Sequence, residues 1–255
     1  MRASMIVPTL NEVESVGTVL RTFRATADEA NRSIFRNDPI DWEMLVIDGA
    51  STDGTGAAAE AAGARVIVER RKGYGRAYRT GFAEATGEII ATSDGDGTYP
   101  VEEIPLLVRR LLDGKLDFIT GDRLAFVTRE AMTTEHRIGN RVLSTTLEIA
   151  YHRYVTGPVG TSIHDSQSGL WVFRRSILDR VSLAQDGMAM SEEIKIEALV
   201  RGFRVEEVPI RYGERVGPPK LSSWRDGLRN LFFLLRKRVE LDRELRAAAR
   251  RDTAP

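Results

Sequence analysis

The amino-acid sequence predicts an α/β protein with a mostly parallel central sheet and helices on both of its faces. Short apolar runs such as Met44–Ile47 alternate with stretches of helical periodicity, which is typical of βαβ units. The runs are apolar at nearly every position, as expected of strands that are buried on both faces. Acidic turns that contain glycine follow several of them, at the end of the strands where such sheets bind their ligands.

The first half of the chain alternates regularly between apolar runs and longer amphipathic stretches. The runs MIV, MLVI, RVIV, EIIATS and FIT predict strands at residues 5–7, 44–47, 65–68, 88–93 and 118–120. The stretches that follow the first four runs predict helices at residues 12–31, 54–62, 74–85 and 100–112.

The second half is less regular. Helices are expected at residues 134–152, 191–200 and 224–250, and strands at residues 170–173 (LWVF) and 205–210 (VEEVPI). Glycine and proline concentrate in residues 213–219, which are expected to form a loop. We therefore divide the chain into a sheet-forming domain over residues 1–212 and an attached loop and helix over residues 213–255.

Composition and charge exclude several classes of function. The 255 residues contain 37 basic and 37 acidic side chains, and a net charge of zero argues against general nucleic-acid binding. The absence of cysteine excludes a disulfide scaffold, a cysteine nucleophile and a thiolate metal site. Residues 211–255 nevertheless contain 12 basic and 6 acidic side chains, so the positive charge is concentrated at one end.

No stretch of the sequence is expected to direct the chain into or across a membrane. The first residues, MRASMIVPTL, lack the basic start and the long apolar stretch of a signal peptide. The strongly apolar run Leu231–Leu235 is far too short to cross a bilayer. The protein is therefore expected to be soluble or attached to a membrane surface.

Polar turns follow three of the predicted strands, in residues 8–12, 48–55 and 93–100. In the third turn, Asp94 and Asp96 are close enough to repel each other unless a cation neutralises them. Carboxylate oxygens suit Mg²⁺ or Mn²⁺, with substrate phosphates completing the coordination. We interpret this pair as a metal site. For Asp53, in the second turn, a structural role in turn formation and helix capping is as good an explanation as a role in the site.

Eight blocks of sequence resemble a known enzyme family. In order they are IVPTLNE, VIDGASTDGT, GYGRAYRTGFAEATG, SDGDGTYP, TGDR, HRIGN, DSQSGLWVFRR and VEEVPIRYGER. Their order and spacing resemble the inverting glycosyltransferases of family 2, above all those that make polyprenyl- or dolichyl-phosphate sugars, over nearly the whole chain. The resemblance implies the Rossmann-like GT-A fold. It also implies transfer of a sugar from a UDP- or GDP-sugar to a polyprenyl or dolichyl phosphate, assisted by Mg²⁺ or Mn²⁺.

The resemblance also implies which residues bind the donor. The donor side comprises Pro8, Thr9, Glu12, Asp48, Asp94 and Asp96. Glu12 is expected near the ribose, Asp48 at the base or ribose, and Asp94 and Asp96 at the cation that bridges to the diphosphate. Several relatives carry glutamine where this chain has Thr98, which leaves a third protein ligand to the metal open.

The resemblance places cations at the acceptor phosphate, namely Arg123, Arg137, Arg215 and Lys220. A lipid phosphate is already an anion at neutral pH, so it needs no general base, only cations that bring two repelling phosphate groups together. Asp165 is a further candidate on the acceptor side. The expected catalytic residues are therefore Asp96, Arg123, Arg137 and Asp165.

Two alternatives remain open from the sequence. A soluble or glycan hydroxyl acceptor, as in a sugar-phosphoglycerate synthase, would need a carboxylate base, for which Glu192–Glu193 or Asp165 are candidates. Acidic residues at 192 and 193 also suit the first turn of a helix. The chain could instead be a non-catalytic nucleotide-binding subunit of a membrane complex. His136, His152 and His164 lack the spacing of a metal site.

The last expected helix combines an apolar stripe with flanking arginine and lysine. This composition is typical of a helix that lies in a membrane interface. The alternative is packing against the sheet or another subunit. With a polyprenyl substrate, membrane contact is favoured, and the protein is expected in the cytoplasm, peripheral at the cytoplasmic face of a membrane. A membrane-protein subunit or a second copy of the chain is a further expected partner.

Overall fold

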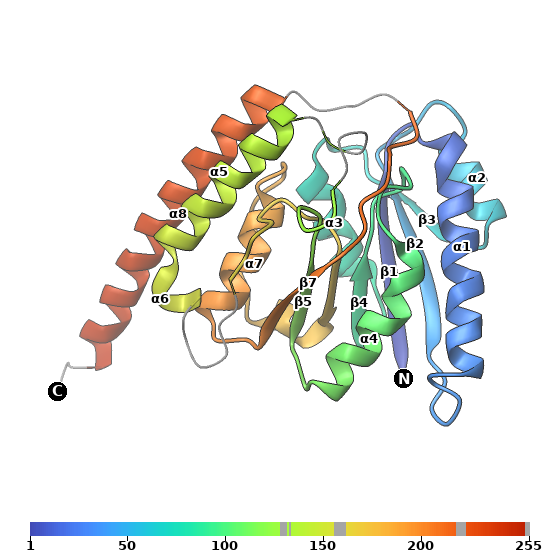
Figure 1. Ribbon diagram of the computed structural model, residues 1–255, viewed down its shortest axis with the longest axis horizontal. Helices are drawn as coiled ribbons and strands as arrows, with labels where there is room; N and C mark the ends of the chain where they lie inside the picture. The colour runs from blue at the N-terminus through green and yellow to red at the C-terminus, as the bar shows by residue number, and fades with distance from the viewer. Residues whose placement is uncertain (128–131, 133, 156–161, 218–222, 253–255) are drawn as a thin grey trace.

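The computed structural model describes residues 1–127, 132, 134–155, 162–217 and 223–252. Within these residues the chain forms a seven-stranded sheet with helices on both faces (Figure 1). The strands are β1 (Arg2–Thr9), β2 (Asp41–Asp48), β3 (Arg65–Val68), β4 (Ile89–Thr92), β5 (Phe118–Asp122), β6 (Trp171–Arg174) and β7 (Val205–Pro209). The α-helices are α1 (Val13–Arg32), α2 (Thr55–Ala61), α3 (Tyr74–Glu84), α4 (Ile104–Asp113), α5 (Thr134–Ala150), α6 (His152–Val155), α7 (Met190–Val200) and α8 (Ser223–Asp252).

The strand order is β3-β2-β1-β4-β6-β5-β7. β6 pairs antiparallel with β4 and β5, and the other pairs are parallel, which confirms the predicted mostly parallel sheet. β1 and β2 are in register so that Thr9 lies beside Asp48 at their carboxyl ends. The turns after β1, β2 and β4 therefore lie at the same edge of the sheet.

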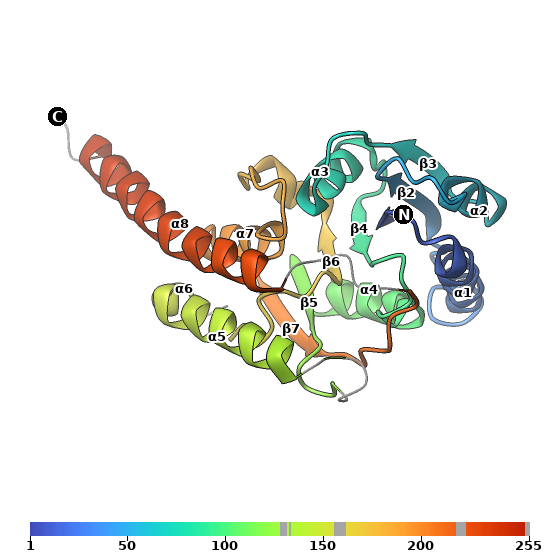
Figure 2. The ribbon, with the colours of Figure 1, turned by 90° about the horizontal axis from the view of Figure 1, so that it is seen from above.

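Alternate residues of the central strands enter two separate cores, which explains why the strands are apolar throughout. Met5 and Val7 of β1 pack under α1 and α4, whereas Ile6 packs under α3 and α7. Figure 2 shows α1, α2 and α4 on one side of the sheet and α3 and α7 on the other. Burial on both faces therefore favours apolar residues at nearly every position of these strands.

α5 and α8 lie side by side at the β7 end of the molecule (Figures 1 and 2). Phe233, Leu234 and Leu241 of α8 are buried in the core that also contains Leu143 and Leu147 of α5. The expected helix at residues 134–152 ends earlier, at Ala150, and the short α6 follows it. The expected domain boundary at residue 212 stays a prediction.

The expected helix at residues 100–112 begins as a 3₁₀ turn, Val101–Glu103, before α4. Pro105 lies in the first turn of α4, where its missing N–H costs no intrahelical hydrogen bond. α4 packs under the sheet through Leu107, Val108 and Leu111. The prediction of one element was right in position, and the proline accounts for where the α-helix begins.

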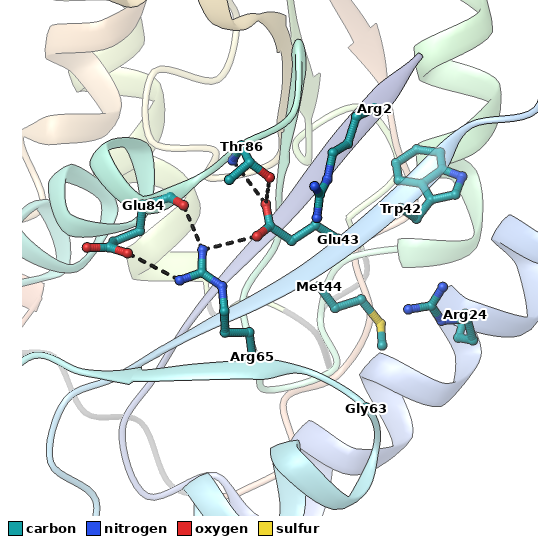
Figure 3. A pocket seen from close by; sticks show the side chains of 9 residues that line it. All are labelled: Arg2, Arg24, Trp42, Glu43, Met44, Gly63, Arg65, Glu84 and Thr86. Carbon is teal, nitrogen blue, oxygen red and sulfur yellow. Dashed lines mark hydrogen bonds and ion pairs between the residues drawn. The ribbon is translucent and has the colours of Figure 1, made fainter.

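A hollow of about 480 Å³ lies at the opposite edge of the sheet, where β1, β2 and β3 begin (Figure 3). Glu43 is its central polar group. Burial by itself raises the pKa of Glu43, but hydrogen bonds from Ser4, Thr86 and Arg65 outweigh it and lower that pKa from 4.5 to about 2. Arg65 also donates to Glu84. These groups hold the starts of the strands together, far from the acidic turns.

We expect Glu43→Gln to destabilise the protein by about 2 kcal/mol at pH 7, because the hydrogen bonds that favour the carboxylate would be weakened. A lowered pKa in the folded state stabilises the protein above pH 4.5. The loss should therefore shrink as the pH falls from 4.5 towards 2. Urea unfolding at pH 7, 4 and 3 measures it. Glu60→Gln, on the exposed side of α2, is the matched control. A loss that does not change with pH would contradict this account.

Candidate active site

The polar turns after β1, β2 and β4 are joined by hydrogen bonds. The Asn11 N–H donates to Ser51 Oγ at 2.8 Å, and the Glu12 N–H donates to Thr55 Oγ1 at 2.7 Å. Ser15 Oγ, in the first turn of α1, donates to the carbonyl of Gly95 at 2.7 Å. These bonds fix the three turns relative to one another, so side chains from distant parts of the sequence converge.

The Asp-x-Asp turn packs directly against Glu12. A Cβ atom on Gly95 would lie 2.6 Å from Glu12 Oε2, so only glycine allows this approach. Asp96 is buried, and its Oδ1 accepts hydrogen bonds from Thr98 N at 3.1 Å and Thr98 Oγ1 at 2.7 Å. Asp94 is half-buried, and its Oδ1 accepts from the Tyr74 hydroxyl at 3.2 Å. The structure thus brings together the predicted donor-side carboxylates of residues 12, 94 and 96.

The carboxylates of this cluster fit a divalent cation. Burial, and then the negative charges of Asp96 and Glu12, raise the pKa of Asp94 to about 8. Such a shift means that the cluster favours added positive charge, whether a proton or a metal ion. The side-chain atoms that these three residues offer to a cation are all carboxylate oxygens, the ligands that Mg²⁺ and Mn²⁺ prefer. Thr98, at the place of the relatives' glutamine, supports Asp96 instead.

Arg215 also reaches this cluster, from the segment between β7 and α8. Its Nη1 lies 2.7 Å from Asp96 Oδ2, and its Nη2 lies 2.9 Å from Glu12 Oε1. The sequence placed Arg215 at the acceptor phosphate. Its observed contacts are with donor-side carboxylates, and the acceptor role stays a prediction.

Asp48 and Thr9 end β2 and β1 beside this cluster. Asp48 is buried, and its Oδ1 accepts from Ser51 Oγ at 2.5 Å and lies 3.4 Å from Thr9 Oγ1. Asp48 Oδ2 accepts from Ser51 N at 3.2 Å. Pro8 is half-buried next to the last residue of β1. These residues lie where the nucleoside is expected, and that role stays a prediction.

Asp53 supports two helices. Its Oδ1 accepts from Thr55 N and Thr55 Oγ1, at the start of α2, and its Oδ2 accepts from Val13 N, at the start of α1. Helix N–H groups at these positions have no partner within their own helix. Of the two explanations that the sequence left open, helix capping accounts for these contacts.

Arg123 and Asp165 form a buried ion pair beside the Asp-x-Asp turn. Arg123 Nε lies 2.7 Å from Asp165 Oδ2 and Nη2 lies 2.9 Å from Oδ1, while the Arg123 N–H donates to Oδ2 at 3.0 Å. Burial raises the pKa of Asp165, but the charge of Arg123 and its hydrogen bonds outweigh this and lower it. The Arg123 guanidinium also lies 5.3 Å from the centre of the Tyr212 ring, which packs edge-on against Tyr99. Arg123 is therefore held in one orientation.

The residues that hold Asp165 were not predicted from the sequence. Lys195 Nζ, fully buried, donates to the Asp165 carbonyl at 2.6 Å, and Glu207 Oε1 accepts from Asp165 N at 3.0 Å. Gln167, two residues on, accepts at Oε1 from Asn230 of α8 at 2.7 Å. Gln167 and Glu207 lie within blocks of the family resemblance, a signal that could have identified them. No sequence signal marks Lys195 or Asn230.

Glu192 and Glu193, the candidate base for a hydroxyl acceptor, are both buried on α7. Glu192 Oε1 accepts from Gln167 Nε2 at 2.6 Å. Glu193 Oε2 accepts the backbone N–H groups of residues 184 and 185. Burial raises the pKa of both carboxyls. Both are part of the packing of α7, which gives the hydroxyl-acceptor alternative no exposed base here.

The remaining predicted residues lie elsewhere. Arg137 is exposed near the start of α5, and in the part of the chain that the structure describes it forms no ion pair with the acidic cluster. Lys220 lies outside the described residues. His164, Glu207 and Asp122 each have one ligand atom within 4.8 Å of the others. Both oxygens of Glu207 already accept hydrogen bonds from the backbone N–H groups of residues 164 and 165, so the Glu207 carboxylate holds this stretch of backbone in place.

Comparison with known proteins decides the family. The family model described as glycosyl transferase family 2 matches residues 4–182. The chain belongs to this family. It is therefore a glycosyltransferase, and both the resemblance and the GT-A fold that it implied are confirmed.

Two relatives from Haloferax volcanii illustrate the similarity. The chain is 31% identical to a dolichyl-phosphate hexose transferase over 224 residues, 88% of each protein. It is 32% identical over 234 residues to the low-salt glycan biosynthesis hexosyltransferase Agl6, covering 91% of this chain but only 52% of that relative. Among solved structures, glucosyl-3-phosphoglycerate synthase from Mycobacterium tuberculosis, in complex with Mn²⁺, UDP and glucosyl-3-phosphoglycerate, superposes with a TM-score of 0.70. The two are 22% identical, over 93% of this chain and 79% of that one.

No helix in the described part of the chain combines the length and the apolar character that a membrane-spanning segment requires.

Proposed function

We propose that this glycosyltransferase moves a sugar from a UDP- or GDP-sugar to a polyprenyl or dolichyl phosphate, with the help of Mg²⁺ or Mn²⁺. The observation that carries the proposal is the cluster of Glu12, Asp94 and Asp96, fixed at the carboxyl edge of the sheet beside the buried Arg123. Relatives named dolichyl-phosphate hexose transferase and polyprenol monophosphomannose synthase support the acceptor class.

On the donor side, Asp94 and Asp96 would hold the cation, and Asp48 and Glu12 would contact the nucleoside. A bound divalent cation supplies positive charge that stabilises the departing diphosphate. The protein contributes a fixed geometry, because Thr98 orients Asp96 and the hydrogen bonds among the three turns hold the cluster together. Little rearrangement is then needed as negative charge develops.

On the acceptor side, an oxygen of the lipid phosphate would form a bond to the anomeric carbon as the bond from that carbon to the diphosphate breaks. The attacking oxygen is already an anion, so no proton has to be removed. Arg123 would attract the acceptor phosphate, with Asp165 fixing the direction of its guanidinium. We propose Arg137, Arg215 and Lys220 as further phosphate ligands. A mechanism without a base also agrees with the burial of Glu192 and Glu193.

We further propose that α5 and α8 rest on the cytoplasmic face of a membrane. Both helices carry exposed apolar residues at helical spacing, which we name the α5–α8 apolar surface: Ile138, Val142, Ile149, Leu228, Phe232, Leu235 and Val239. Exposed arginines on the same two helices include Arg141, Arg229, Arg236 and Arg243, and Arg153 is exposed on the adjoining α6. Apolar residues beside basic ones bind anionic leaflets. An acceptor lipid could then reach the site from the bilayer.

Replacing both Phe232 and Leu235 by aspartate should weaken binding to vesicles containing anionic phospholipid by about tenfold or more, because two exposed apolar side chains are lost. Co-sedimentation with vesicles measures the bound fraction. Val68→Asp removes an apolar residue about as exposed as Leu235 from β3, the outer strand farthest from β7, and should leave binding unchanged. Equal binding by the double variant and the wild type would show that this surface does not bind the membrane.

The proposed reaction is tested by incubating the protein with Mg²⁺, vesicles that contain polyprenyl phosphate, and a panel of labelled UDP- and GDP-sugars. We expect label from at least one donor to enter the organic phase, in proportion to the lipid phosphate supplied. Transfer to a soluble hydroxyl acceptor such as 3-phosphoglycerate, without lipid, would favour the first alternative. Nucleotide binding without any turnover would favour a non-catalytic subunit.

A further inference from the structure

We propose that Arg215 competes with the divalent cation for Asp96, so that metal binds tightly only when the nucleotide sugar draws Arg215 away. The inference rests on the proposed function, because it concerns the same carboxylates. It adds that the affinity for the metal depends on whether the nucleotide sugar is bound, and that Arg215 sets this dependence.

The two oxygens of Asp96 are both occupied. Oδ1 accepts two hydrogen bonds from Thr98, at 3.1 and 2.7 Å, within its own turn. Oδ2 lies 2.7 Å from Nη1 of Arg215. Asp96 is almost completely buried, so no other face of its carboxylate is open to solvent. A cation that binds Asp96 without breaking its own turn must take the position that Arg215 holds.

Arg215 is placed there by more than one contact. Its second terminal nitrogen, Nη2, lies 2.9 Å from Glu12 Oε1. The backbone on either side is fastened to the Asp-x-Asp turn: Gly213 N donates to the Thr98 carbonyl at 2.8 Å, and Val216 N donates to the Asp96 carbonyl at 3.1 Å. The position of the guanidinium therefore follows from the path of the backbone, as well as from attraction between opposite charges.

Nucleotide and metal should consequently help each other to bind. A metal ion alone must displace a guanidinium from a partly buried pair, which opposes binding. A diphosphate offers that guanidinium a new anionic partner with which planar, two-pronged hydrogen bonds form readily. Once Arg215 has moved to the phosphate, Oδ2 of Asp96 is available to the cation. By linkage, each ligand raises the affinity for the other by the same factor.

The test is Mn²⁺ binding by the full chain, followed by electron paramagnetic resonance of free Mn²⁺, without nucleotide and with UDP or GDP. Without nucleotide, Arg215→Gln should bind Mn²⁺ about tenfold more tightly than the wild type. Adding nucleotide should raise the Mn²⁺ affinity of the wild type more than that of the variant. Arg211→Gln is the matched control, because Arg211 is exposed on the same segment and its charge acts on Glu103. It should behave as the wild type.

Asp96→Asn separates this inference from the proposed function. If Asp96→Asn weakens Mn²⁺ binding while Arg215→Gln binds as the wild type does, the competition is wrong and the metal site stands. If Asp96→Asn leaves Mn²⁺ binding unchanged with nucleotide present, the proposed metal site itself is wrong. Circular dichroism of each variant establishes that it is folded. A gain of affinity in Arg215→Gln that disappears in the double variant with Asp96→Asn supports the competition.

Discussion

Asp96→Asn is expected to lower the rate of sugar transfer by about a thousandfold or more, and to remove its dependence on Mg²⁺ or Mn²⁺. The amide keeps an oxygen that can accept the hydrogen bonds of Thr98, so the turn should persist. It loses the negative charge that would hold the cation. Initial rates at saturating donor, measured over a range of Mg²⁺ concentrations, check both expectations.

Asp53→Asn is the matched control for this change. Asp53 is also a carboxylate in a polar turn at this edge of the sheet, but its contacts are with the starts of α1 and α2. Its replacement should cost less than about 1 kcal/mol of stability, because asparagine caps helices about as well as aspartate, and turnover should change little. Full activity of Asp96→Asn, or an equal loss in both variants, would show that Asp96 has no special role.

Asp165→Ala is expected to lower the free energy of unfolding by about 3–5 kcal/mol, because Arg123 would be left buried without its partner. Activity should also fall, since only the Tyr212 ring would be left to hold the direction of the guanidinium. Urea unfolding, monitored by circular dichroism, measures the loss of stability. A loss below about 1 kcal/mol would contradict the view that this pair is an essential buried contact.

A double variant separates structure from chemistry at the same place. Asp165→Asn combined with Arg123→Met removes both charges but keeps an oxygen that accepts the backbone N–H of residue 123. Such paired removal is often nearly neutral, so most of the stability should return. Transfer activity should not return, because no guanidinium remains for the acceptor phosphate. Transfer activity in the double variant would show that Arg123 takes no part in the mechanism.

The fold follows closely from the sequence because its strands are buried on both faces. The run at residues 44–47 could belong only to a buried element, and it forms the centre of β2. The ends of the strands were harder to predict from the sequence. β1 pairs with β2 from Arg2 onward rather than from residue 5. The apolar pattern missed this because Ser4 is polar and yet buried, with Glu43 and Gly87 as hydrogen-bond partners. Periodicity cannot reveal a polar residue whose partners lie far along the chain.

The acidic part of the candidate site was predictable for a similar reason. Glu12, Asp94 and Asp96 follow parallel strands, and parallel strands end at one edge. The contact between Arg215 and Glu12 was not predictable, because it joins residues 203 positions apart and depends on the path taken after β7. The burial of Lys195 was equally hidden, since α7 has the charges of a surface helix but is covered by other elements.

α8 packs within the molecule on one side and leaves apolar residues exposed on another. One side of the helix packs in the core through Phe233, Leu234 and Leu241. Its other apolar residues, among them Phe232 and Leu235, remain exposed. Packing within the molecule thus explains one apolar stripe, and the proposed membrane contact concerns the other.

The bond formed in the product tests the central claim most directly. Phosphorus-31 NMR of the lipid product, made with polyprenyl phosphate, Mg²⁺ and the preferred nucleotide sugar, identifies that bond. We predict a single phosphodiester phosphorus joining lipid and sugar, with one nucleoside diphosphate released for each sugar transferred. A lipid diphosphate formed together with nucleoside monophosphate, or sugar found only on a water-soluble acceptor, would contradict the account.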